Sequence, residues 1–325
     1  MRTILLMLII GIPLPSHAQN REKTSLKTDD NQTTIYAGER PVLSYVHKET
    51  PPPEGINPLY KRSAYIHPLW SPGGERLTRI QPPDHYHHYG IWNPWTRTHF
   101  DGYKVDFWNL AEAQGTVRFA QYLDKYNKDD RAGFKVKQQH IYFKEDGTEG
   151  VAINEYWEVS LIKTEEKVYV LDLITTLKSP LKDGITLEAY RYGGGLGFRA
   201  TEKWGTDNCT VLTSEGKTRK DADASEARWV IIEGESSVPE GRSGILFLSH
   251  PSNQSHPEPM RVWPPETMEG KENVFFEFCP IRHEQWVLKH GTDYTLRYRM
   301  VVFDGTMEPE AAENYWKQFS SIKTP

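Results

Sequence analysis

The stretch KVYVLDLITTLKS, residues 167–179, decides the fold class because apolar and polar side chains alternate along it. Four large apolar side chains stand at odd positions: Tyr169, Leu171, Leu173 and Leu177. Polar side chains stand at even positions: Asp172, Thr176 and Lys178. Successive side chains of a strand point to opposite faces, so this pattern predicts a half-buried β-strand.

Seven further stretches are similarly rich in β-branched and aromatic residues, and turn signals such as Glu145-Asp146-Gly147 and Lys182-Asp183-Gly184 separate them. They are residues 116–123, 134–143, 151–162, 227–234, 244–250, 273–279 and 294–303. Long strands that follow one another in sequence favour antiparallel pairing. One clear helix signal occurs, at residues 308–319, where Pro309 suits a first helical turn. We therefore expect an all-β fold, an antiparallel β-sandwich with one C-terminal helix.

The N-terminus has the pattern of a secretory signal peptide. Arg2 precedes a short apolar run, and Ser16 and Ala18 supply small residues at the positions before a cleavage point. Later in the chain, no apolar stretch approaches the length of a transmembrane helix. We expect a signal peptide over 1–18, a flexible polar leader over 19–33 and a single β-sandwich domain over 34–325. The mature protein is then exported, periplasmic or secreted, with no membrane span.

The composition limits the class of partner. The formal net charge is −5, and the sequence shows no basic stripe of the kind that nucleic acid requires. The 10 Trp and 17 Tyr suit a sugar-binding cleft, although large β-proteins also fill their cores with aromatic side chains. Cys209 and Cys279 fit two independent buried thiols better than a disulfide framework.

The segment PPDHYHHYGIWNPW, residues 82–95, concentrates the polar and aromatic groups. Two prolines and Gly90 indicate a rigid loop or strand end, where binding and catalytic groups are often placed. In an extended chain, His85 and His87 would share one face and His88 the other. Three interpretations compete: acid–base chemistry or substrate contact, which we favour, a metal site, and a purely structural loop. The spacing lacks the helical pattern of common zinc sites, so we expect no metal and no effect of a chelator.

Two other polar segments supply possible partners for this loop. Residues 187–204 contain Glu188, Tyr190 and Arg191 before three glycines, which mark a bulge or a close approach of the backbone to a ligand. Residues 248–264 form a second proline-rich loop, with four candidate substrate-binding residues: His250, Asn253, His256 and Trp263. Taken alone, each segment is more readily explained as a structural element than as a binding site. Together they predict one cleft built from three distant parts of the chain.

Several segments resemble an exported family often labelled PmoA, over roughly residues 34–320. The matching segments are residues 67–95, 106–109 (DFWN), 192–199 (YGGGLGFR), 249–253 (SHPSN) and 296–305. The label comes from a membrane subunit of methane monooxygenase and does not suit a chain without a spanning helix. The resemblance implies a β-sandwich similar to galactose-mutarotase-like and polysaccharide-lyase proteins, and a sugar substrate. It assigns no reaction, because a fold does not fix a function.

We therefore expect an exported carbohydrate-active enzyme, a glycoside hydrolase or lyase acting on oligosaccharides, without a cofactor. The alternatives are a non-catalytic carbohydrate-binding protein and a mutarotase or epimerase. His87 or His88 is the expected acid–base group, and Asp84 or Glu188 its carboxylate partner. The other expected substrate contacts share aromatic, cationic or amide groups: His85, Trp92, Trp95, Tyr190, Arg191, His250, Asn253, His256 and Trp263.

Overall fold

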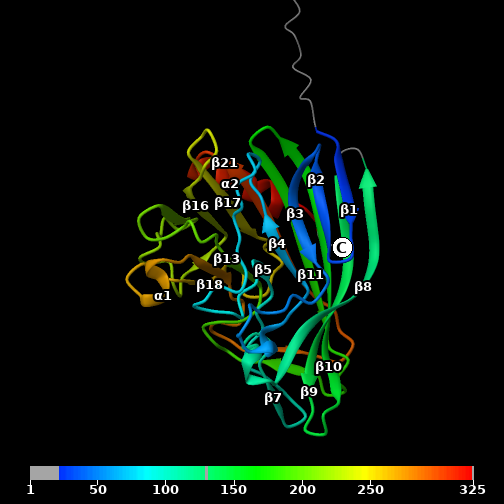
Figure 1. Cartoon of the computed structure of the whole chain (residues 1–325). Coiled ribbons are helices and arrows are strands. Elements are labelled where there is room, and N and C mark those ends of the chain that lie inside the picture. Colours follow the sequence, from blue (N-terminus) through cyan, green and yellow to red (C-terminus); the bar gives the residue numbers. More distant parts are fainter. Residues whose placement is uncertain (1–21, 129–130, 324–325) are drawn as a thin grey trace, which may run out of the picture.

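The computed structural model describes residues 22–128 and 131–323. The predicted signal peptide lies outside these residues. Within them the chain is an all-β protein of three antiparallel sheets with one long helix near the C-terminus (Figure 1). This confirms the predicted fold class, although we expected two sheets.

The first sheet has nine strands. In spatial order they are β1 (Thr24–Thr28), β2 (Gln32–Ala37), β3 (Arg40–Val46), β4 (Tyr65–Leu69), β5 (Ile91–Trp92), β13 (Leu196–Arg199), β19 (Phe275–Phe278), β18 (Glu258–Val262) and β15 (Glu226–Ala227). Most of these strands are short, and only β19 and β15 overlap the predicted stretches. Because β5 pairs with β13, the end of the histidine-rich segment lies beside the strand that follows the three glycines.

The second sheet contains the long strands that the sequence predicts. Its order is β14 (Cys209–Thr213), β16 (Trp229–Glu235), β17 (Arg242–Ser249), β21 (Tyr294–Asp304), β11 (Val168–Lys178), β10 (Glu149–Glu165), β9 (Arg131–Phe143) and β8 (Gly115–Lys128). The alternation along β11 is confirmed, since its odd-numbered apolar residues are fully buried. On the other face, Asp172 accepts hydrogen bonds at 2.7 and 3.0 Å from the Arg299 guanidinium of β21.

A small third sheet and the helices complete the fold. The sheet runs β20 (Trp286–Leu288), β12 (Ile185–Leu187), β6 (Thr98–Phe100) and β7 (Tyr103–Val105), and β7 lies at the end toward which β9 and β10 extend (Figure 1). The predicted C-terminal helix is α2 (Pro309–Ser320). A one-turn helix, α1 (Met268–Lys271), and two 3-10 turns, η1 (Pro58–Tyr60) and η2 (Leu110–Glu112), stand in loops.

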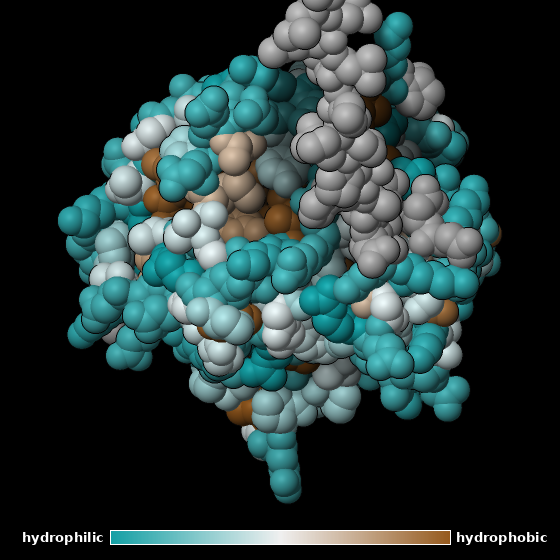
Figure 2. All heavy atoms as spheres, turned by 90° about the horizontal axis from the view of Figure 1, so that it is seen from above, coloured by the Kyte–Doolittle hydropathy of each residue, from teal (hydrophilic) through white to brown (hydrophobic). Residues whose placement is uncertain are grey.

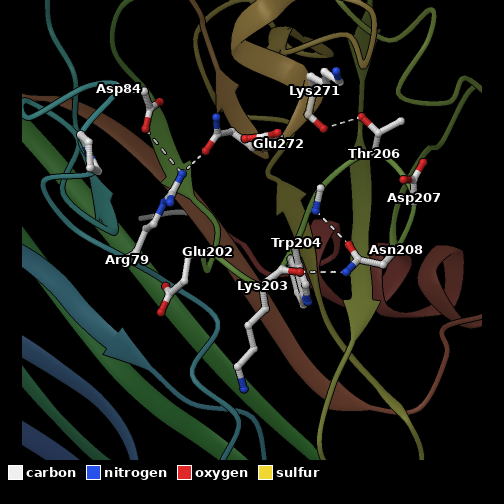
Figure 3. A pocket seen from close by; sticks show the side chains of 13 residues that line it. Arg79, Asp84, Glu202, Lys203, Trp204, Thr206, Asp207, Asn208, Lys271 and Glu272 are labelled. Carbon is white, nitrogen blue, oxygen red and sulfur yellow. Dashed lines mark hydrogen bonds and ion pairs between the residues drawn. The ribbon is translucent and has the colours of Figure 1, made fainter.

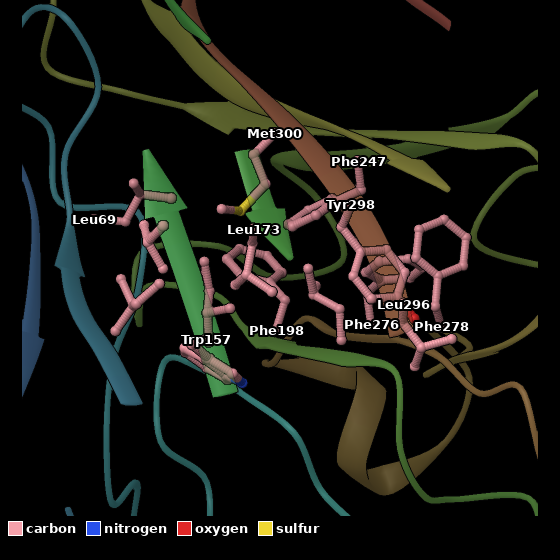
Figure 4. Packing of buried hydrophobic residues seen from close by; sticks show 14 of the residues in the cluster. Leu69, Trp157, Leu173, Phe198, Phe247, Phe276, Phe278, Leu296, Tyr298 and Met300 are labelled. Carbon is pink, nitrogen blue, oxygen red and sulfur yellow. The ribbon is translucent and has the colours of Figure 1, made fainter. Parts of the chain in front are cut away.

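The two large sheets face each other across one apolar core. Tyr45 of β3 packs against Trp157 of β10 with ring centroids 6.0 Å apart, and Phe198 of β13 packs against Phe247 of β17 at 5.1 Å. Figure 4 shows this packing between strands of both sheets. The surface seen from above is mostly hydrophilic, with apolar atoms visible in a hollow (Figure 2). Cys209 and Cys279 are separate buried thiols, as expected.

One prediction near the N-terminus is wrong in part. The predicted flexible leader includes Thr24–Thr28, which form the edge strand β1 and pair with β2 in regular antiparallel register. This edge strand buries little side-chain area, so its sequence is mostly polar and carries no hydrophobic pattern. Backbone pairing holds it in place.

Candidate functional site

The histidine-rich segment folds as two successive turns. The backbone N–H of His85 donates to the carbonyl of Pro82 at 2.9 Å, and that of His88 donates to the carbonyl of His85 at 3.0 Å. These turns bring the rings of His85, His87 and His88 together, with centroids 4.7 to 5.3 Å apart. The segment is a loop, as predicted, and the alternation that would point His88 away from the other two in an extended chain does not apply.

The three histidines border a cavity of about 230 Å³. Its other lining residues come from four separate places in the chain: Thr96, Trp108, Asn109, Tyr190, Arg191, Tyr192 and Trp263. Trp108 and Trp263 are almost fully buried, so only a small part of each side chain reaches the surface of the cavity. Tyr190 and Tyr192 are half-buried, and Arg191 is exposed. Among the described residues that line this cavity, none is Asp or Glu.

Asp84 fixes the orientation of the histidine turns. Its Oδ2 accepts a hydrogen bond from Nδ1 of His85 at 2.8 Å and another from Nη2 of the buried Arg199 at 2.6 Å. Partial burial alone would raise the pKa of Asp84, but these two partners bring it well below its usual range. The carboxylate is thus ionised and can only accept, so Nδ1 of His85 carries a proton, and in the neutral form of this ring the lone pair lies on Nε2.

His87 and His88 differ from His85 in their surroundings. Burial lowers the pKa of His87 to about 3, and the positive charges of Arg199 and of the protonated form of His85 add to this effect. Burial also lowers the pKa of His88 far below its usual value. Both rings are therefore neutral at neutral pH, and they offer lone pairs rather than transferable protons.

Tyr192 is the polar group that the sequence analysis left out of the site. Its hydroxyl oxygen accepts hydrogen bonds from Nη2 of Arg261 at 2.9 Å and from Nε1 of Trp263 at 3.1 Å. A phenolic oxygen has two acceptor positions and one proton. With both acceptor positions occupied, the proton of Tyr192 is free to be donated to a ligand in the cavity.

Asp84 also borders a second, larger cavity of about 570 Å³ (Figure 3). Charges of both signs line it, and several are paired with each other. Arg79 lies 3.6 Å from Oδ1 of Asp84 and donates to Asn273, while Asn208 is bonded to the backbone of Lys203. Trp204 is fully buried here, so no aromatic face is offered to a sugar. This cavity is less suited than the first to the chemistry expected from the sequence.

The structure separates several residues that we expected in one cleft. Glu188 accepts from Nδ1 of His99 at 2.8 Å and lines an adjoining cavity of about 440 Å³, which shares Tyr190 with the first. Trp92 and Trp95 are fully buried in the core and cannot stack on a sugar. Gly194 leaves room for the Trp95 ring, so this glycine serves core packing rather than a ligand.

The loop after β17 is a structural element, contrary to our expectation. Nε2 of His250 donates to the backbone carbonyl of Ile322 at 3.2 Å, and its ring packs against Phe319 of α2. Asn253 accepts at 2.7 Å from the backbone N–H of Arg297. His256 stacks on Trp316 of the same helix and lines a different cavity. These groups fasten the loop to its neighbours, because each finds a partner within the protein.

The histidine turns, DFWN and the glycine-rich segment also lie within a region that matches a known sequence family. DUF6807, described as a family of unknown function, matches residues 32–317. The chain belongs to the DUF6807 family. None of the curated proteins matches this DUF6807 chain. No helix in residues 22–128 or 131–323 is both long enough and apolar enough to cross a membrane.

Solved structures similar to this DUF6807 chain are remote. One is a heparan sulfate lyase from Pedobacter heparinus, with 8% identity and a TM-score of 0.38, matched over 89% of this chain and 36% of the lyase. Another is a galactose mutarotase related enzyme from Lactobacillus acidophilus, with 9% identity and a TM-score of 0.36, matched over 88% of this chain and 99% of that one. The chain thus spans about a third of the length of the lyase.

Proposed function

We propose that the protein is an exported carbohydrate-active enzyme that cleaves an acidic oligosaccharide by elimination at the cavity of His85 and Tyr192. The observation that carries this proposal is the hydrogen bonding of Tyr192. Arg261 and Trp263 occupy both acceptor positions of its hydroxyl oxygen, which leaves a proton donor in the cavity. The pattern of residues 1–18 supports export.

The cavity also has the size and lining that one sugar residue needs. Its volume of about 230 Å³ equals that of about eight waters at roughly 30 Å³ each, which is the order of one sugar ring. Tyr190 and Tyr192 offer partly exposed aromatic faces. Arg191 adds an exposed cation, which suits a carboxylate on the substrate.

The absence of acidic residues from the lining favours elimination over hydrolysis. Most glycosidases need two carboxyl groups that face each other across the scissile bond, and the described lining of this cavity has none. In an elimination, a base removes the proton next to the sugar carboxylate. The electron pair left on carbon forms a carbon–carbon double bond as the bond to the leaving oxygen breaks and its electrons pass to that oxygen. Nε2 of His85 supplies the acceptor for that proton, and Tyr192 donates its proton to the leaving oxygen.

The test is incubation of the mature protein with a panel of uronic-acid-containing oligosaccharides. Elimination gives an unsaturated product that absorbs in the ultraviolet. Tyr192→Phe removes only the hydroxyl, and we expect it to lower kcat by about 10²- to 10⁴-fold, the usual contribution of a general acid. Glu188→Gln is the matched control and should keep wild-type turnover, because Glu188 lies in the adjoining cavity.

Two results would contradict this proposal. Saturated products, or loss of turnover in Glu188→Gln, would favour a hydrolase that uses Glu188. Saturable binding of the oligosaccharides with no product of either kind would favour a non-catalytic carbohydrate-binding protein.

A further inference from the structure

The three clustered histidines have a geometry that proton transfer alone does not require. One ring nitrogen from each of His85, His87 and His88 lies within 4.8 Å of the other two. Around one tetrahedral ion with metal–nitrogen bonds of about 2.1 Å, such nitrogens stand about 3.4 Å apart. Shifts of about 1 Å in the rings would therefore bring all three nitrogens onto a single ion.

The ring centroids support the same arrangement. They are separated by 5.3 Å for His85 and His87, 4.7 Å for His85 and His88, and 4.9 Å for His87 and His88. Imidazoles bound to one ion through bonds of about 2.1 Å have their centroids roughly 4.5 to 5.3 Å apart at bond angles between 90° and 109°. The two turns thus place the rings at the spacing that they would have around a shared ion.

Asp84 provides the outer contact that metal-binding histidines usually make. Such a histidine donates its second ring N–H to a carboxylate or carbonyl, which fixes the ring and its tautomer. Nδ1 of His85 donates to Asp84 at 2.8 Å, so Nε2 is the free ligand atom. The ring of His87 makes no hydrogen bond to any residue within 22–128 or 131–323, and its backbone carbonyl is held by Nε1 of Trp108 at 3.1 Å.

His88 needs one rearrangement to act as a ligand. Nη1 of Arg199 lies 3.3 Å from Nδ1 of His88, a long contact in which the guanidinium donates and the ring proton resides on Nε2. Binding of an ion through Nε2 moves that proton to Nδ1 with no net release. Arg199 then gives up this contact and keeps its shorter bonds from Nη2 to Asp84 and Asn273, at 2.6 and 2.7 Å.

We infer that His85, His87 and His88 bind one divalent transition-metal ion, with the cavity of Tyr192 supplying its open coordination positions. Three imidazole ligands suit zinc, copper, iron or nickel, and three protein ligands with an open position are typical of a catalytic rather than a structural site. The spacing of the histidines in the sequence argued against a metal because it lacks the helical pattern of common zinc sites, whereas here two successive turns bring the rings together. The inference deepens the proposed function and rests on it for its catalytic role, since a bound ion would attract the carboxylate of an acidic sugar. A ring nitrogen that binds an ion cannot also accept the substrate proton, so with the ion bound a hydroxide at its open position would take that proton in place of Nε2 of His85.

Binding can be tested without any substrate. Tag-free mature protein is stripped with a chelator, dialysed, and titrated with Zn²⁺ by calorimetry and with Co²⁺ by visible absorption. We expect one ion per chain and the intense absorption of low-symmetry, nitrogen-ligated Co²⁺. His87→Ala should weaken binding at least about 100-fold. Asp84→Asn weakens the outer contact to His85 and removes the negative charge that faces Arg199 and Arg79, and it should weaken binding about 10- to 100-fold. His283→Ala removes one exposed imidazole and should bind like the wild type.

The outcomes separate this inference from the proposed function. No stoichiometric binding, or equal binding by the wild type and folded His85→Ala, His87→Ala and His88→Ala variants, overturns the metal site. Unsaturated product that still forms after complete chelation overturns a catalytic ion and leaves the proposed function standing. Histidine-dependent binding of one ion, with no turnover of any acidic oligosaccharide, supports the metal site and counts against the proposed function.

Discussion

Glu258 is a buried carboxyl group whose titration should be visible in the pH dependence of stability. It is the first residue of β18 and is fully buried. Its Oε1 accepts from Ser249 at 2.6 Å and from Asn253 at 2.7 Å, and its Oε2 lies 2.9 Å from the hydroxyl of Tyr298. No cation is among these partners. Glu258→Gln keeps the shape and the hydrogen bonds of the protonated group but removes the titration.

The magnitude follows from the pKa of Glu258 in the two states. Burial raises it from 4.5 to about 7, although the three hydrogen bonds oppose the rise. The folded state then binds more protons than the unfolded state between pH 4.5 and 7, so the free energy of unfolding falls as the pH rises through this range. At about 1.4 kcal/mol per pKa unit, the wild type should lose about 3 kcal/mol relative to Glu258→Gln. Below pH 4.5 and above pH 7.5 the difference in free energy of unfolding between the two proteins should be nearly constant.

The assay is urea unfolding of the wild type and the variant at pH values from 4 to 8. The quantity to follow is the difference in free energy of unfolding between the two proteins. Histidines such as His67 and His256 have pKa values lowered by burial, and in both proteins they make the free energy of unfolding rise with pH. Glu145→Gln, in an exposed turn, is the control for removing one charge. If the difference in free energy of unfolding between the two proteins does not change from pH 4 to 8, the pKa of Glu258 is not raised in the folded state, and the reasoning is refuted.

Three further substitutions test the fold and the site. Glu155→Ala should cost about 3 to 5 kcal/mol in urea unfolding, because the fully buried carboxylate accepts from five donors, including His140 and Trp157; a loss below about 1 kcal/mol would contradict that. Gly194→Ala should lower the melting temperature strongly, since its φ is +86° and a Cβ would meet the Trp95 ring; an unchanged melting curve would refute this. His250→Ala should lower the melting temperature but keep wild-type kcat/KM, and a selective loss of turnover would return His250 to the site.

Some features of this protein follow from local sequence. Alternation along residues 167–179 predicted β11, because a strand with one buried face repeats every two residues whatever packs against it. The other long strands of the second sheet follow for the same reason, and Pro309 marks the start of α2. The density of histidines at 85–88 pointed to a segment that does border a cavity, because polar rings concentrated in one loop indicate that the loop presents them to something.

Other features depended on contacts between distant residues. Edge strand β1 carries no hydrophobic pattern, so only pairing with β2 reveals it. Tyr192 becomes a proton donor only when Arg261 and Trp263, about 70 positions away, occupy its oxygen. Trp92 and Trp95 are indistinguishable in sequence from exposed platforms, yet both are fully buried, Trp92 against Trp108 and Phe275 and Trp95 against Trp286 of the third sheet. The direction in which each histidine side chain points was also set by the two turns rather than by the spacing in sequence. This direction depends on the backbone conformation, which tertiary packing selects.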